Sequence, residues 1–467
     1  MRQQFLRRTL LAATVGVLLA GCSSTVVVGR ASPGEGEPVD VSAEAFPITG
    51  VSDTPIDQFA RNALTDLNTF WGEAYPHFYD GKFQPLRGGY FSVDSDNIDD
   101  KAYPDTGIGC GGAPKSPNSV SGNAFYDPAC DLIAYDRSLL EELSTDYGRF
   151  LVPVVMAHEF GHAMQKRFGY AASGRSIQDE TQADCFSGAW SRWMADGKAA
   201  HTSLRTPELD GVVRGFLLLR DDVGSDPEDA HAHGSFFDRV SAFYEGFDGG
   251  VASCRDDFGA DRLFTAAPFS ASDAADQGNA PYDDIVGWIR QTLPDFWNSA
   301  FSEAFDRDFQ APRFRPFDGT APHCGDDDVS RQNLGYCPKN STVYYDETDL
   351  THPAYQELGD FAVATALALP YSMAARAEGG LSVDDAAATR SAVCLTGWYT
   401  DRWYAGAFDD TLKVQLSPGD VDEAVQFLLR YGADPAVFPN TALSGFEMVG
   451  AFRSGFLEGG AACDIGL

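Results

Sequence analysis

The sequence predicts an α+β fold that is predominantly helical and consists of two tandem units derived from an internal duplication. Three observations predict it. Similar segments recur in both halves, the pairs Cys185/Cys254 and Cys394/Cys463 share one spacing of 69 residues, and amphipathic helical runs outnumber short strand-like runs. A chain of 467 residues with 44% hydrophobic residues is long enough for two domains, each with its own core.

The N-terminus has the pattern of an export signal. Three arginines precede the apolar run LLAATVGVLLA, which is too short to span a membrane, and LAGC follows at 19–22. We therefore expect a lipoprotein signal peptide over 1–21, a lipid such as palmitate on Cys22, and a flexible tether over 22–50. The predicted location is the cell envelope, with the chain anchored by lipid to the outer face of the cytoplasmic membrane. Export by the general or the twin-arginine route stays open.

The charge of the chain excludes one class of partner. The formal net charge is −34, and the expected signal peptide removes arginines but no acids, so the remainder is more acidic still. Such a chain repels nucleic acid and anionic lipid headgroups. We expect no nucleic-acid partner, and contact with the membrane only through the lipid on Cys22.

The repeated segments define the two units. Residues 55–84 match residues 281–310, and FDRVSAFYEGFDGGVASC at 237–254 matches FEMVGAFRSGFLEGGAAC at 446–463. We expect a first unit over 51–254, a linker over 255–280 and a second unit over 281–467. In each unit an amphipathic helix comes first, followed by short strands and then several helices.

In the first unit the expected strands are GGYFSV and DLIAY, and Asp136 is the expected N-cap of the next helix.

Eight cysteines remain after Cys22, an even number typical of disulfides in an exported chain. Because equivalent units should pair equivalently, Cys185–Cys254 and Cys394–Cys463 are favoured as one type of bridge. Cys110–Cys130 and Cys324–Cys337 would form the other type. Spacing alone leaves other connectivities open.

One stretch of the first unit carries a candidate metal site. FLVPVVMAHEFGHAMQKRFG places His158 and His162 four residues apart, so both imidazoles lie on one helix face and can bind one metal ion. Glu159 lies beside that face, where it can act as a general base without being a ligand. Catalytic zinc takes three protein ligands, and Glu180 in the downstream DETQAD is the candidate third. Asp184, one turn later, is expected to orient a zinc-bound histidine.

Two alternatives compete with this interpretation. The run LVPVVMA is apolar enough that an ordinary core helix explains it, and two histidines at this spacing are usually plain helix residues. The combination with ExxxD downstream and with an export signal favours zinc. A ligand set with a third histidine six residues after His162 is excluded, because that position is Phe168.

The segments AHEFGHAMQ, ETQADCFSGAW and HGSFFDRVSAFYEGF resemble the putative neutral zinc metallopeptidase family. With the lipobox and the double unit, the chain is most similar to the peptidase-like lipoproteins of actinobacteria. The resemblance implies zincin-like units and a gluzincin-like site, with His158, His162 and Glu180 holding one Zn²⁺ per chain and Glu159 as catalytic base. His233 in HAHGSFFDR is the expected donor to the oxyanion, with His231 as a weaker alternative.

The second unit is expected to lack this site. Aligning the halves on Phe150/Phe361 and on Cys185/Cys394 replaces every candidate ligand and catalytic residue. In their places stand Leu369, Pro370, Met373, Thr389, Val393 and Ala442.

The sequence thus predicts a lipid-anchored zinc peptidase that hydrolyses a peptide or protein substrate outside the cytoplasmic membrane. The alternative is a non-catalytic zinc-binding envelope protein that acts as a binding or assembly module. Closed structural zinc sites usually have four Cys or His ligands, and no fourth is evident here. By analogy with zincins, we expect the strand near Asp131–Tyr135 to form the edge of the substrate cleft.

Overall fold

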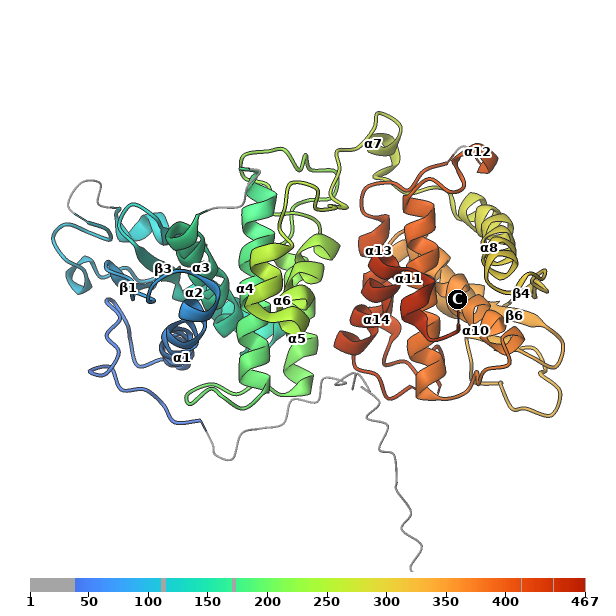
Figure 1. Cartoon of the computed structure of the whole chain (residues 1–467), viewed down its shortest axis with the longest axis horizontal. Helices are drawn as coiled ribbons and strands as arrows, with labels where there is room; N and C mark the ends of the chain where they lie inside the picture. Colours follow the sequence, from blue (N-terminus) through green and yellow to red (C-terminus); the bar gives the residue numbers. More distant parts are fainter. Residues whose placement is uncertain (1–37, 111–114, 170–173, 413, 440, 467) are drawn as a thin grey trace, which may run out of the picture.

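Figure 1 shows the computed structural model of the chain, which describes residues 38–110, 115–169, 174–412, 414–439 and 441–466. The expected signal peptide, Cys22 and the tether up to residue 37 lie outside the described residues and stay predictions. Within the described residues, no helix combines the length and the apolar composition needed to cross a bilayer.

The first half begins with a long helix, continues through a small sheet and ends in a group of packed helices (Figure 1). Its elements are α1 (Pro55–Phe78), β1 (Gly89–Val93), β2 (Ala124–Asp127), β3 (Leu132–Asp136), α2 (Arg137–Tyr147), α3 (Leu151–Phe168), α4 (Ser176–Ala195), α5 (Thr206–Leu219) and α6 (Phe236–Asp256). Asp136 caps α2 as expected, because its side chain accepts a hydrogen bond from the Ser138 amide.

The second half contains the same kinds of element in a similar order. After the short α7 (Asp273–Asp276) come α8 (Tyr282–Phe305), β4 (Arg313–Phe317), β5 (Leu334–Cys337), β6 (Thr342–Asp346), α9 (His352–Glu357), α10 (Asp360–Glu378), α11 (Ala386–Tyr404), α12 (Asp409–Leu412), α13 (Asp420–Tyr431) and α14 (Gly445–Glu458). The prediction of a predominantly helical α+β fold is confirmed.

The two sheets have the same topology. In the first, β3 lies in the centre, parallel to β1 and antiparallel to β2. In the second, β6 lies in the centre, parallel to β4 and antiparallel to β5. The expectation that Asp131–Tyr135 forms an edge of the sheet is wrong, because this segment is the buried central strand β3. The outer strands are β1 and β2, and the one that borders the candidate site is β2, whose short sequence AFYD has no alternating pattern.

Glycines let the helices of each half pack closely. A Cβ on Gly246 of α6 would lie 1.7 Å from the carbonyl oxygen of Cys185, and one on Gly455 of α14 would lie 1.7 Å from that of Cys394. No side chain fits at such a distance, so glycine is required at both crossings. The structure contains the four disulfides in the favoured pairing, Cys110–Cys130, Cys185–Cys254, Cys324–Cys337 and Cys394–Cys463.

The two halves meet along α5 and α6 on one side and α13 and α14 on the other (Figure 1). The rings of Tyr244 and Phe446 stack with centroids 4.4 Å apart, and Phe237 packs edge-on against Phe456. One continuous hydrophobic cluster therefore runs through both halves. Helix α6 belongs to this junction and also packs against α4, which carries part of the candidate site.

Candidate metal centre

The candidate site lies where α3 crosses α4. Pro153 falls in the first turn of α3, where its missing amide hydrogen costs no helical hydrogen bond, and Gly169 ends the helix with a φ of 103°. A Cβ on Gly161 would lie 2.9 Å from the Cα of Ala183, so the glycine of HEFGH allows α4 to approach α3 closely. This approach brings Glu180 opposite the two histidines.

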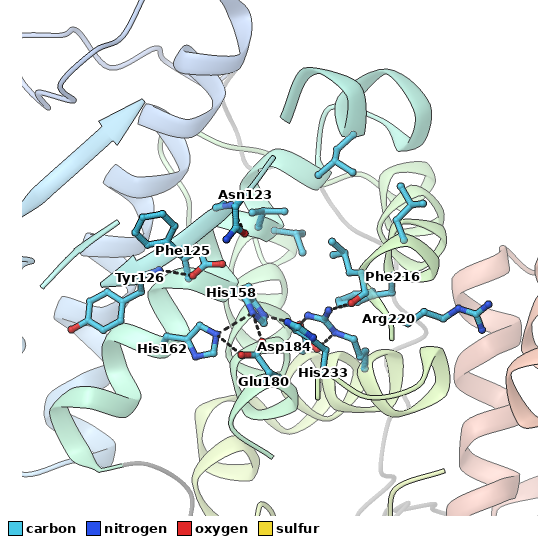
Figure 2. Close-up of a pocket in the computed structure, with 18 of the residues that line it drawn as sticks. Asn123, Phe125, Tyr126, His158, His162, Glu180, Asp184, Phe216, Arg220 and His233 are labelled. Atoms are coloured by element: carbon cyan, nitrogen blue, oxygen red, sulfur yellow. Dashed lines mark hydrogen bonds and ion pairs between the residues drawn. The ribbon is translucent and has the colours of Figure 1, made fainter. Parts of the chain in front are cut away.

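The three expected ligands converge (Figure 2). His158 Nε2 lies 3.2 Å from His162 Nε2 and 3.1 Å from Glu180 Oε2, and His162 Nε2 lies 3.4 Å from Glu180 Oε1. Four zinc ligands at about 2.0–2.2 Å in a tetrahedron are about 3.3–3.6 Å apart. The spacing and chemistry of these donors therefore fit three corners of a zinc tetrahedron.

Hydrogen bonds on the far side of each ring direct the Nε2 atoms inward. His158 Nδ1 lies 2.8 Å from Asp184 Oδ1, and His162 Nδ1 lies 2.8 Å from Gln165 Oε1. Both partners are acceptors, because a carboxylate cannot donate and the Gln165 amide nitrogen donates to the Asp179 carbonyl. Each ring therefore carries its proton on Nδ1 and turns the lone pair of Nε2 to the centre.

A buried arginine completes the network around Asp184. Arg239 of α6 donates from Nε to Asp184 Oδ2 at 2.7 Å and from a terminal nitrogen to Oδ1 at 2.9 Å. Both side chains are almost fully buried. This bidentate pair fixes the carboxylate that orients His158.

The electrostatics of the site favour a bound positive charge. Burial lowers the pKa of His158, but Asp184 and Glu180 outweigh it and raise that pKa to about 10. Burial raises the pKa of Glu180, but the two histidines outweigh it and hold that pKa well below its usual range. The carboxylates thus stabilise positive charge between the two imidazole rings. Either a proton on a ring or a bound metal ion can provide that charge.

Glu159 lies on the neighbouring side of α3 and faces β2. Its Oε2 accepts a hydrogen bond of 2.8 Å from the Tyr126 amide, and burial is the main cause that raises its pKa. Since the Tyr126 amide is not used by β3, it points out of the open edge of the sheet. Glu159 therefore marks the place where the β2 edge meets the candidate centre.

These residues line a cavity of about 750 Å³. Its lining combines apolar side chains, including Phe125, Leu139 and Phe216, with the candidate ligands, Arg220 and His233. Apolar side chains around a few convergent polar groups are typical of a ligand site.

His233 lies in the loop before α6, and the Asp221 carboxylate accepts hydrogen bonds from its amide and lies 3.1 Å from its Nδ1. The alternative His231 is exposed and does not line the cavity.

The structure brings together His158, His162, Glu180 and Asp184 and places Glu159 beside them. His233 lines the same cavity. Sequence reasoning missed three contributors, namely Gln165, Arg239 and the Tyr126 amide. A signal existed for two of them: Gln165 lies one turn after His162, and Arg239 lies within HGSFFDR.

The aligned positions in α10 and α11 provide no histidine, cysteine or carboxylate. Among the described residues, one other group of such side chains is close enough for a metal ion, and it lies elsewhere in the second half.

Comparisons with known proteins agree with this geometry. A family model described as "Putative neutral zinc metallopeptidase" matches residues 9–258. The chain is 29% identical over 177 residues to "Uncharacterized protein YpfJ" of Escherichia coli (strain K12), covering 33% of this chain and 58% of the relative. It is 28% identical over 180 residues to "Uncharacterized protein Rv2575" of Mycobacterium tuberculosis (strain ATCC 25618 / H37Rv), covering 33% and 59%. The chain thus spans less than two thirds of these relatives' length. No solved structure matches.

Proposed function

The chain belongs to the putative neutral zinc metallopeptidase family, and on that premise we propose that it is a zinc-dependent peptidase. The observation that carries the proposal is the convergence of two imidazoles and one carboxylate at 3.1–3.4 Å from one another, in a cavity lined by a further carboxylate. Three protein ligands leave a fourth position open, as catalytic zinc requires. A bound zinc ion would polarise a scissile carbonyl and make an attacking water more acidic.

The residues of the chain take separate roles in this proposal. His158, His162 and Glu180 hold the ion, and Asp184 keeps His158 in the binding tautomer. Glu159 takes a proton from the attacking water and returns it to the leaving amine. The Tyr126 amide that hydrogen bonds to Glu159 holds the carboxylate toward the cleft.

His233 is the proposed donor to the developing oxyanion. Its Nδ1 is close enough to donate to Asp221, so Nε2 is free to face the cavity. Donation from Nε2 requires a ring that carries both protons, because Nδ1 already faces the Asp221 carboxylate.

The open edge of β2 supports binding of an extended peptide. The outward Tyr126 amide shows which edge groups face the cavity, and Phe125 and Tyr126 line it directly. A substrate would pair with this edge as an added strand, and its side chains would contact the apolar side chains that line the cavity.

We also propose that the halves arose by internal duplication and that the second is non-catalytic. The equal sheet topology, the paired glycine crossings and the two 69-residue disulfides support the duplication. The replacement of all candidate ligands supports a single zinc ion per chain.

The proposed location is the outer face of the cytoplasmic membrane, through lipid on Cys22, and it rests on the LAGC sequence and the four disulfides. The net charge of −34 argues against a nucleic-acid substrate.

The test is metal analysis of residues 23–467 with casein cleavage as the readout, on the parent chain and on Glu159→Gln. The matched control is Glu141→Gln, a change at an exposed position of α2. We expect one zinc ion in all three proteins and cleavage by the parent and the control only. Zinc without cleavage by any of them would favour the alternative of a non-catalytic zinc-binding module. Absence of zinc from the parent would overturn the proposal.

A further inference from the structure

Three carboxylates gather in the second half at the N-termini of two helices. Asp360 begins α10, Asp420 begins α13, and Glu423 lies one turn into α13. One ligand oxygen from each lies within 4.8 Å of the others. They come from segments 60 residues apart, so the packing of α10 against α13 brings them together.

Each carboxylate uses one oxygen for the backbone. Asp360 Oδ2 accepts from the Ala280 amide at 2.9 Å, Asp420 Oδ2 from the Ser417 amide at 2.7 Å, and Glu423 Oε2 from the Phe361 amide at 2.8 Å. These contacts satisfy free amides near the helix ends, and a purely structural role would stop there.

The remaining oxygens of the two aspartates have no such explanation. Asp360 and Asp420 are 4% and 5% exposed, and the Oδ1 atom of each is buried without a hydrogen-bond partner. A buried carboxylate oxygen without a partner loses its hydration and gains nothing in return. Both side chains line a cavity of about 610 Å³, so space for a ligand and its water is present beside them.

The cluster has no compensating positive side chain in the part of the chain that the structure describes, where no Arg or Lys forms an ion pair with any of the three carboxylates. Burial is the main cause that raises the pKa of Asp360 to about 6. Backbone hydrogen bonds and a contact with Glu423 oppose this shift only in part. Burial and then the neighbouring Asp360 raise the pKa values of Asp420 and Glu423 well above their usual range. A bound cation removes this penalty.

We propose that Asp360, Asp420 and Glu423 bind a Ca²⁺ ion that joins the N-termini of α10 and α13. The donors are all oxygens, which suit Ca²⁺ and Mg²⁺ rather than the zinc expected between imidazoles. Ca²⁺ takes six to eight oxygen ligands at about 2.3–2.6 Å in flexible geometry, whereas Mg²⁺ demands a near-ideal octahedron and retains most of its water. Three carboxylates whose other oxygens are already held by backbone amides therefore suit Ca²⁺ better.

The position of the site gives the ion a structural consequence. Asp422 lies between Asp420 and Glu423, and its carboxylate crosses to the first half, where it accepts from the amides of Phe236 and Phe237. It also pairs with Arg220 of the candidate cleft at 2.7 Å. An ion that fixes the first turn of α13 therefore also fixes the contact that holds the start of α6. The inference does not depend on the proposed peptidase activity.

The test uses Tb³⁺ as a luminescent substitute for Ca²⁺ on the zinc-loaded body of the chain, residues 23–467. Trp288 and Trp403 line the same cavity and can sensitise a bound Tb³⁺. We expect one saturable luminescent site from which Ca²⁺ displaces Tb³⁺, and at least a tenfold loss of Tb³⁺ affinity in Asp420→Asn. The matched control is Asp283→Asn with Asp284→Asn, two exposed acids at the start of α8, and it should bind as the parent does. This control separates the site from weak binding to an acidic surface.

A thermal-unfolding measurement covers the case of a misfolded variant. Asparagine cannot ionise, so Asp420→Asn removes the repulsion that Asp420 contributes to the crowded carboxylates, and in calcium-free buffer we expect its midpoint at or above that of the parent. Ca²⁺ should raise the midpoint of the parent and leave the variant unchanged. Equal Tb³⁺ affinity in Asp420→Asn and the parent would overturn the proposal. So would a parent midpoint that responds to pH but not to Ca²⁺, because it would mean that the carboxylates share protons instead.

Discussion

Replacing Asp184 by Asn should separate zinc affinity from folding. The side chain is 0% exposed and serves two partners, His158 Nδ1 at 2.8 Å and the Arg239 guanidinium at 2.7 and 2.9 Å. Loss of such an orienting carboxylate weakens metal binding about ten- to a hundredfold, or about 1.4–2.7 kcal/mol. The amide also leaves the Arg239 charge buried without compensation, which destabilises the fold by about 3–5 kcal/mol. Only the loss of zinc affinity could be expected from the sequence, because the contact with Arg239 arises from tertiary packing.

Two measurements separate these effects. Competition with a chelating dye gives the zinc affinity, and urea unfolding of the metal-free protein gives the stability. The double change Asp184→Asn with Arg239→Met removes the uncompensated charge, so it should recover most of the stability but not the zinc affinity. Asp196→Asn is the matched control at the C-cap of the same helix, where an exposed carboxylate pairs with Arg192, and the change should cost less than about 1 kcal/mol. A zinc affinity of Asp184→Asn within twofold of the parent would refute the orienting role.

Two further changes test the framework around the site. Burial alone would raise the pKa of Asp131, but the backbone amide of Arg87 and the Arg167 side chain outweigh it and lower that pKa. The ionised form therefore stabilises the fold above the unfolded pKa of about 3.9, and this contribution is lost as pH falls through the folded value. Asn tolerates the φ of 57° at this position, so Asp131→Asn should lower the free energy of unfolding by about 1–3 kcal/mol at pH 7 without backbone strain. It should also reduce the fall in the unfolding midpoint between neutral and acidic pH, and an unchanged fall would contradict this. Asp422→Asn should lower the unfolding free energy by about 2 kcal/mol while zinc content stays at one per chain, because Asp422 contacts Arg220 and not the ligands; loss of zinc would contradict this.

The parts of the site that sequence could predict are those set by local geometry. His158 and His162 share a face because a helix places residues four apart together, and Glu180 with Asp184 repeats that spacing on the next helix. Arg239 is different, because its contact with Asp184 spans 55 residues and depends on the packing of α6 against α4. No periodicity in a single sequence encodes that crossing.

The sheet illustrates the same limit. The segments of β1 and β3 were recognisable from their own composition, but their order in the sheet depends on pairing between residues far apart in the chain. The prediction by analogy with zincins placed β3 at the edge of the cleft. In the structure the turn between β2 and β3 makes β2 the outer strand of this pair. Strand order is a property of long-range contacts, so local patterns could not supply it.

Helix α6 connects the two halves to the chemistry proposed for the first. Ser235 caps its start, and Asp422 of α13 accepts the two amides that follow, so the second half supplies part of the helix terminus. One turn later Arg239 holds Asp184, and at the far end Cys254 joins α6 to α4. A shift of α13 would therefore reach Asp184, and through it His158, by way of the part of α6 that precedes the kink at Gly250. The second half, which offers no candidate zinc ligand at the aligned positions, would contribute to the proposed centre by this route.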